Sequence, residues 1–268
     1  MGERSRAAKG GRVTGTFAGR VALVSGGSGG VGRAVAADLA RAGADVALTS
    51  HSHPQRAEQA AAAVRQAGRR ALVLPTDLRD ASATEKAVAR TVAELGRLDV
   101  LVHAAGGDVD WAPVRDIQPQ GFADFIAIDL VGAFNVIQPA VRHMHGAGGG
   151  AVVAISSIAA QMCQSRNSQG AASKAGLEAL IRVIAREEGR YGIRANAVSI
   201  GLTDTEQARL AFERWGPKAT EQVIAGIPLQ RIARPEEVAR MVLFLAGEEG
   251  GYVTGKVIQV DGGQIIAA

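Results

Sequence analysis

The sequence has a single cysteine, Cys163, among 268 residues. An intramolecular disulfide and a cysteine-based zinc site are therefore both excluded. The pairs His51-x-His53 and His143-x-His145 are completed by no carboxylate or cysteine at ligand spacing, so we expect no metal site. Long hydrophobic runs are also missing: no stretch approaches the ~20 apolar residues that span a bilayer, and the N-terminus lacks the apolar core of a secretory signal. We expect a cytoplasmic protein that does not bind membranes.

The formal net charge of the chain comes entirely from its N-terminal residues. Residues 1–20 carry five basic residues and one acid, a charge of +4, and the whole chain also has a formal charge of +4. Residues 21–268 are therefore formally neutral, and the Gly- and Arg-rich N-terminus is the part of the chain that could contact nucleic acid or an anionic membrane. We interpret residues 1–19 as a flexible basic leader and expect no nucleic-acid partner.

Hydrophobic residues make up 47% of the chain, arranged as short apolar runs that alternate with amphipathic helical segments. The runs that predict strands are 21–25, 45–50, 71–74, 99–103, 151–155, 194–199 and 256–260. Parallel neighbours need crossover helices, and strands that are apolar without strict alternation indicate a sheet covered on both faces. The sequence predicts a single doubly wound α/β domain with a seven-stranded parallel sheet over residues 20–268.

A glycine-rich segment, SGGSGGVG at residues 25–32, connects the first predicted strand to the first predicted helix. A tight turn at this place lets the backbone approach a pyrophosphate, whose charge the helix N-terminus favours. We interpret the segment as the phosphate loop of a Rossmann-type dinucleotide site. The predicted cofactor contacts within it are Ser25, Gly26, Ser28, Gly30, Val31 and Gly32.

The end of the second predicted strand, TSHSH at residues 49–53, contains no acid. A carboxylate at this place binds the ribose 2′-hydroxyl and repels a 2′-phosphate, whereas hydroxyls and an imidazolium suit a phosphate. Asp45 lies at the opposite end of the strand, too far away to serve. We therefore expect NADP(H) in preference to NAD(H), with Ser50 and His51 as contacts. The alternative is that His51 and His53 belong to a solvated loop.

Several further segments add to the glycine loop: TDL at 76–78, LDVLV at 98–102, VTG at 253–255 and VDGG at 260–263. Together they resemble the motifs of the short-chain dehydrogenase/reductase family over residues 20–264, with Ser25 in place of Thr in the TGxxxGxG fingerprint. The resemblance implies further cofactor contacts at Asp77, Leu78, Ala104, Ala105, Gly106, Lys174, Gly201 and Thr203.

The family's catalytic positions are only partly matched. Lys174 in ASKAG matches a Lys that holds the nicotinamide ribose and lowers the pKa of a Tyr four residues earlier, but this chain has Gly170 there. Ser157, 13 residues before Gly170, matches the Ser that binds the substrate carbonyl. Asp129 replaces an Asn that supports a proton-relay water. The resemblance implies Ser157, Lys174 and Asp129 as catalytic residues of an atypical site that lacks the tyrosine.

No other residue is placed to replace that tyrosine. The chain has only Tyr191 and Tyr252, both distant in sequence. Enoyl reductases of this fold place a Tyr seven residues before the Lys, where this chain has Asn167. The segment around Lys174 also resembles the 2,4-dienoyl-CoA reductases, which likewise lack the Tyr. Gly170→Tyr is expected to raise ketone reduction if the pocket is otherwise that of the family, because a missing general acid costs about 10²–10⁴-fold.

Three functional hypotheses follow. The first is an NADP(H)-dependent reductase of a C=O or activated C=C in a small or polycyclic substrate, since a cation or hydroxyl can stabilise an enolate that water protonates. The second is a non-redox cyclase, dehydratase or isomerase in which a desolvated Asp129 acts as a base; its alternative role is a salt bridge to Lys174. The third is a catalytically silent nucleotide-binding protein. We carry the first forward.

Residues 202–228 fall where the family has its substrate-covering lid. Within it, Phe212 and Trp215 either face an apolar substrate or pack together. Met162 and Cys163 are further candidates for the pocket wall.

The resemblance also implies assembly. We expect a homotetramer or homodimer formed through the helices at about 119–145 and 168–190. The expected ligands are the cofactor and a small-molecule substrate.

Overall fold

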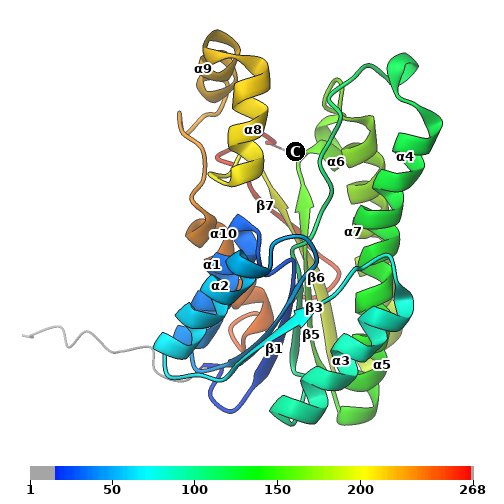
Figure 1. Ribbon diagram of the computed structural model, residues 1–268, viewed down its shortest axis with the longest axis vertical. Helices are drawn as coiled ribbons and strands as arrows, with labels where there is room; N and C mark the ends of the chain where they lie inside the picture. The colour runs from blue at the N-terminus through cyan, green and yellow to red at the C-terminus, as the bar shows by residue number, and fades with distance from the viewer. Residues whose placement is uncertain (1–15, 267–268) are drawn as a thin grey trace, which may run out of the picture.

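Seven strands form one parallel sheet in the order β3-β2-β1-β4-β5-β6-β7 (Figure 1). The computed structural model describes residues 16–266. The strands are β1 (Val21–Ser25), β2 (Asp45–Ser50), β3 (Ala71–Pro75), β4 (Val100–His103), β5 (Gly150–Ser157), β6 (Ile193–Ile200) and β7 (Val257–Val260). In register, Ala22 of β1 lies between Val46 of β2 and Val100 of β4. The predicted doubly wound architecture is confirmed.

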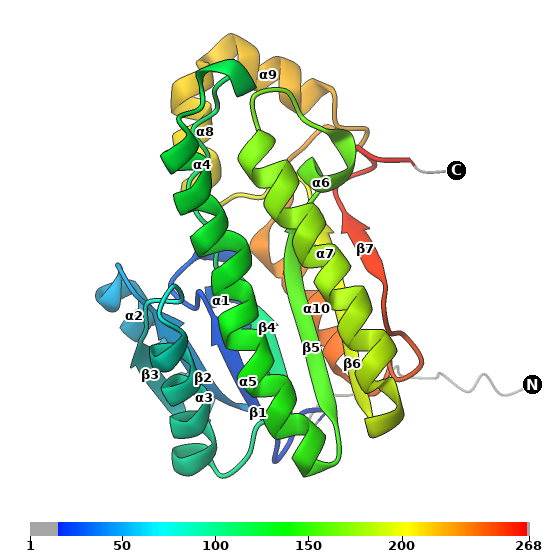
Figure 2. The same ribbon diagram turned by 90° about the vertical axis from the view of Figure 1, so that its right-hand side faces the viewer.

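Helices cover both faces of the sheet, as Figures 1 and 2 show from two sides. One face carries α1 (Gly30–Arg41), α2 (Pro54–Gln66) and α10 (Pro235–Ala246); the other carries α3 (Ala81–Leu95), α5 (Gly132–Ala147) and α7 (Ser168–Glu188). Each face encloses its own apolar core. The strands point side chains into both cores, so burial on both sides explains why they are apolar without alternation.

The remaining elements lie mostly above the carboxyl ends of the strands. They are η1 (Val114–Asp116), α4 (Pro119–Ile126), η2 (Ala127–Val131), α6 (Ala159–Met162), η3 (Gly189–Tyr191), α8 (Glu206–Trp215) and α9 (Pro217–Ala225). Figure 1 shows α8 and α9 projecting beyond the sheet on the side of α1. The strand order reverses between β1 and β4, and the crevice outside such a switch point is where open α/β sheets bind ligands.

One helical stretch of the described residues, Pro119–Ala147, is long and apolar enough to cross a membrane by length and composition alone. Its Ala133, Val136, Ile137 and Met144 are at most 1% exposed and belong to the core between α5 and the sheet. The stretch is therefore a core helix of this fold.

The fold begins before β1. Phe17 is 1% exposed and packs in the core shared by α1 and α10, and its backbone N–H donates to the carbonyl oxygen of Ala42. Residues 16–19, which the sequence analysis assigns to the leader, are thus part of the fold, because the aromatic side chain covers the end of this core. Residues 1–15 of the leader lie outside the described residues.

Arg194 on β6 ties the sheet to the end of α10. Its half-buried guanidinium donates to the backbone oxygens of Leu245, Ala246, Gly247 and Gly250. The last carbonyl groups of a helix have no partner within the helix, so the planar fork of an arginine satisfies several of them at once.

We expect Arg194→Ala to lower the free energy of unfolding by about 2–3 kcal/mol, because it leaves buried carbonyl oxygens without a donor. Urea denaturation measures this change. The control is Arg240→Ala on α10, an exposed side chain, for which we expect a change below about 0.5 kcal/mol. Equal losses in the two variants would contradict the assignment.

Candidate functional site

A cavity of about 1020 Å³ lies at the carboxyl ends of the strands, between the glycine-rich loop and α8. All three predicted catalytic residues, Ser157, Lys174 and Asp129, line it. The predicted cofactor residues that also line it are Gly26, Ser28, Gly30, Val31, Ser50, His51, Asp77, Leu78, Ala104, Ala105, Gly106, Gly201 and Thr203. The structure thus brings together residues from across the sequence in one hollow.

The glycine-rich loop fits a pyrophosphate. Gly26 has a φ of +71°, and a Cβ there would lie 2.6 Å from the backbone of Ala105, so only glycine allows the loop to approach β4 this closely. α1 begins at Gly30 with Gly29 at its N-cap and no side-chain cap. The first N–H groups of α1 therefore have no side-chain acceptor at the wall of the cavity, where an anion can accept from them.

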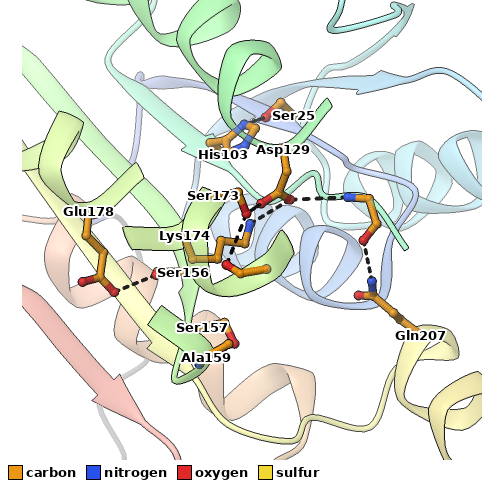
Figure 3. Close-up of polar contacts among 12 residues, drawn as sticks. Ser25, His103, Asp129, Ser156, Ser157, Ala159, Ser173, Lys174, Glu178 and Gln207 are labelled. Atoms are coloured by element: carbon orange, nitrogen blue, oxygen red, sulfur yellow. Dashed lines mark hydrogen bonds and ion pairs between the residues drawn. The ribbon is translucent and has the colours of Figure 1, made fainter. Parts of the chain in front are cut away.

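Two predicted cofactor contacts, Ser25 and Gly32, do not line the cavity. The Oγ of Ser25 lies 2.8 Å from Nδ1 of His103 (Figure 3), and a Cβ on Gly32 would overlap the carbonyl oxygen of Gly26. Both residues support the loop from beneath. Ser25 and Gly32 therefore contribute to the conformation of the glycine-rich turn and do not line the cavity.

Two arginines that the sequence analysis missed line the cavity together with Ser50 and His51. Arg56 from α2 and Arg79 from the loop after β3 both line the wall. Arg79 donates to both carboxylate oxygens of Asp77, at 2.6 to 3.1 Å, and these bonds lower the pKa of Asp77 to about 2. The negative charge of Asp77 is therefore paired with Arg79, and Arg56 adds a further positive charge to the cavity wall.

Asp129 lies in the π-helical turn η2, an irregularity that is frequent at functional sites. It is 1% exposed and accepts hydrogen bonds from Ser173 Oγ at 2.5 Å and Lys174 Nζ at 3.1 Å (Figure 3). Burial raises the pKa of Asp129, but the charge of Lys174 and the two hydrogen bonds outweigh it, so the pKa is held below the usual value. Asp129 is an anion in a salt bridge, as the second of its two predicted roles requires, and not a base of raised pKa.

Ser157 is the last residue of β5 and lines the cavity, and its hydroxyl hydrogen is available for a hydrogen bond. Its Oγ accepts the backbone N–H of Ala159 at 3.2 Å, so its own hydrogen remains to be donated elsewhere. Figure 3 shows Ser157 beside Ala159.

Gly170 lies in the first turn of α7, buried, one turn before Lys174. Asn167 is the N-cap of this helix, and its Oδ1 accepts the backbone N–H of Gly170 at 3.2 Å. A Cβ on Gly170 would overlap that Oδ1 and lie 3.1 Å from Cγ of Asn167. Gly170→Tyr therefore requires Asn167 to move, which the sequence analysis did not foresee.

His103 ends β4 beneath the cavity and is fully buried. Its Nδ1 is bonded to Ser25, while its Nε2 has no hydrogen-bond partner among residues 16–266. Burial lowers the pKa of His103 to about 3, and the charge of Lys174 acts in the same direction. The imidazole is neutral at physiological pH.

We expect stability to fall in acid because of His103. The unfolded imidazole takes up a proton below about pH 6.5, whereas the folded one stays neutral down to about pH 3, so the unfolded state binds more protons between these values. The expected loss between pH 7 and pH 5 is about 2 kcal/mol. His103→Asn removes this contribution, which urea denaturation at the two pH values measures. An equal acid loss in the variant would disprove the assignment.

Both tryptophans of the chain line the cavity. Trp111, from the loop after β4, packs edge to face on Trp215 of α8 with ring centroids 5.2 Å apart. Phe212 contacts Trp215 but does not line the cavity; Met162 lines it and Cys163 does not. Trp111 could not be recognised from the sequence, since its loop has no periodic pattern.

Helix α8 is fastened over the cavity by two polar contacts to this loop. Gln207 Nε2 donates to the carbonyl oxygen of Gly107 at 2.9 Å (Figure 3), and Arg214 donates to that of Val109 at 3.2 Å. The segment predicted as a lid therefore folds as α8 and α9, with α8 closing one side of the site.

Comparisons with known proteins agree with this geometry. Residues 26–264 match the family model described as enoyl-(acyl carrier protein) reductase. The cis-4-hydroxycyclohexanecarboxylate dehydrogenase of Sinomonas cyclohexanicum is 40% identical, over 92% of this chain and 97% of its own length. The chain belongs to the short-chain dehydrogenase/reductase family. An acetoacetyl-CoA reductase of Rhizobium meliloti (strain 1021) is 37% identical over 92% of this chain and 99% of its own.

Solved structures of short-chain dehydrogenases/reductases superpose closely. Levodione reductase has a TM-score of 0.90 at 32% identity, covering 92% of this chain and 98% of its own. A Burkholderia cenocepacia short-chain dehydrogenase in complex with NADP has a TM-score of 0.85 at 33% identity, covering 93% and 99%. Carveol dehydrogenase from Mycobacterium avium in complex with NAD has a TM-score of 0.88 at 31% identity, covering 94% and 99%. The chain is an oxidoreductase of this family.

Proposed function

We propose that the chain is an NADP(H)-dependent reductase with a non-standard active site, acting on a C=O or activated C=C of a small or polycyclic organic substrate. The observation that carries the proposal is the convergence of Ser157, Lys174 and Asp129 on the cavity that the glycine-rich loop opens into. The bound cofactor supplies the hydride. The residues of the chain bind and orient the cofactor and the substrate, and they polarise the substrate.

The preference for NADP(H) rests on charge in the cavity wall. Arg56 and Arg79 line it with Ser50 and His51, and β2 ends without an acid. A 2′-phosphate is favoured by these cations, while no carboxylate is available to bind a free 2′-hydroxyl. Asp45, the acid of β2, lies at the other end of the strand and is paired with Arg70.

Lys174 and Ser157 supply donors to the ligands. One N–H of the Lys174 ammonium is bonded to Asp129, which leaves two for the ribose hydroxyls of the cofactor. Ser157 offers its hydroxyl proton to the substrate oxygen. Neither Tyr191 nor Tyr252 lines the cavity, so in this proposal Gly170 marks a site without a phenol. The non-redox alternative depended on a raised pKa at Asp129, which its ion pair works against.

We also propose a cytoplasmic homodimer or homotetramer. The outer faces of η2, α5 and α7 expose Val131, Phe134 and Val183, each 47–50% exposed. Pairing of these helices with a second copy removes that apolar surface from water.

We expect NADPH to bind at least about 10-fold more tightly than NADH, because a phosphate–arginine contact contributes about 1.5 kcal/mol or more. Trp111 and Trp215 are the only tryptophans and both line the cavity, so energy transfer from tryptophan to the bound dihydronicotinamide reports binding directly. Arg56→Ala should weaken NADPH about 10-fold and leave NADH unchanged.

The control for this titration is Lys86→Ala, an exposed residue of α3 outside the cavity. Equal affinity for the two cofactors would refute the NADP(H) preference. Failure to bind either cofactor would refute the reductase itself.

A further inference from the structure

We propose that the side-chain amide of Asn167 takes the place of the missing phenol as a hydrogen-bond donor to the substrate oxygen, and that the site therefore reduces activated C=C bonds in preference to isolated ketones. The inference rests on the proposed function and specifies its substrate class.

Asn167 occupies the space from which a side chain at position 170 would project. It is 6% exposed and lines the cavity together with Ser157 and Lys174. Its Oδ1 lies too close to the place that a Cβ of residue 170 would take for both atoms to fit without a shift. The absence of a side chain at Gly170 and the presence of an amide at Asn167 are thus two parts of one arrangement.

The orientation of this amide is fixed by its partners. The backbone N–H of Gly170 requires an acceptor, so the carbonyl oxygen of Asn167 faces the helix and its Nδ2 faces away. Nδ2 donates to Oε1 of Gln164 at 3.3 Å, its single acceptor among residues 16–266, and Gln164 also lines the cavity. The second N–H of Asn167 is left to donate to a ligand, as is the hydroxyl of Ser157.

An amide can polarise a substrate oxygen but does not give up its proton. The ammonium of Lys174 donates one of its hydrogen bonds to the carboxylate of Asp129. An isolated ketone becomes an alkoxide on hydride addition and needs a proton from the site. A conjugated C=C–C=O substrate becomes an enolate, a much weaker base, which two hydrogen-bond donors can stabilise without proton transfer.

The β-carbon of the substrate accepts the hydride of the reduced nicotinamide. The C=C electron pair then forms the bond between the α-carbon and the carbonyl carbon, and the C=O pair moves to the oxygen, which Asn167 and Ser157 bind as an enolate. The α-carbon takes a proton from water, and the electrons return to the C=O bond. The products are the saturated carbonyl compound, the oxidised nicotinamide and hydroxide, which the buffer neutralises.

The arrangement of Asn167 and Gly170 is tested first, without substrate or cofactor, by thermal unfolding. Alanine normally stabilises a helical position relative to glycine. We expect Gly170→Ala to lower Tm by about 2 °C in the wild type, where the new methyl displaces the cap, and to raise Tm by about 2 °C in an Asn167→Ala background. The same sign in both backgrounds would overturn the inference.

The role in catalysis is tested by variants that keep the helix cap but lose the amide donor. Asn167→Asp is nearly isosteric and Asn167→Ser is an equally good cap, so both should fold and bind NADPH as the wild type does. We expect kcat with 2-cyclohexen-1-one, followed by NADPH consumption and by product analysis, to fall about 100-fold in Asn167→Asp. Ser165→Ala, an exposed residue two positions earlier, is the matched control and should stay within about twofold of the wild type.

The substrates distinguish this inference from the proposed function. We expect the wild type to reduce 2-cyclohexen-1-one at its C=C bond, with a kcat flat between pH 6 and pH 9 because an amide does not titrate, and to leave cyclohexanone unchanged. Reduction of cyclohexanone but not of the enone would overturn the inference and leave the reductase standing. If NADPH is consumed neither with the enone nor with the ketone, both the inference and the proposed reductase function are overturned. An unchanged kcat in Asn167→Asp would overturn the inference alone.

Discussion

Parallel pairing of all seven strands is the constraint on which the rest of this structure depends. It places every carboxyl strand end on one edge of the sheet and requires helices on both faces to return the chain. The order reverses between β1 and β4, so the loops that follow these strands diverge and leave a crevice. The phosphate loop, the loop that carries Trp111 and the strand end that carries Ser157 meet at this edge for that reason alone.

Within the crevice, a buried ion pair organises the chemistry. Asp129 and Lys174 are 1% and 13% exposed in their side chains, and breaking such a pair is costly because it leaves one charge buried without a partner. The π-helical turn at η2 brings Asp129 to this position between α4 and α5. Lys174 is thereby held in place by Asp129, while the neutral His103 below adds no charge to the site.

The wall of the site combines apolar and cationic side chains. Trp111 and Trp215 pack on each other in the lining, and Arg56 and Arg79 belong to the same lining as Ser50. The contacts from Gln207 and Arg214 to the loop after β4 hold the wall together, so α8 and the loop form one unit.

The sequence by itself determined the fold and the glycine-rich turn between the first strand and the first helix, because period and turn residues are local properties of the chain; the resemblance to the family pointed to Ser157, Asp129 and Lys174. Tertiary structure decided what depends on contacts between distant segments. It paired Asp129 with Lys174, set Ser25 and Gly32 beneath the loop, and brought Phe17 into the core. The contact between Asn167 and Gly170 is local to the start of α7, but the overlap of the Asn167 side chain with a Cβ at position 170 exists only once the helix and its cap have formed. Charge pairing and steric overlap depend on distances in the folded chain, and these distances cannot be read from the order of the residues.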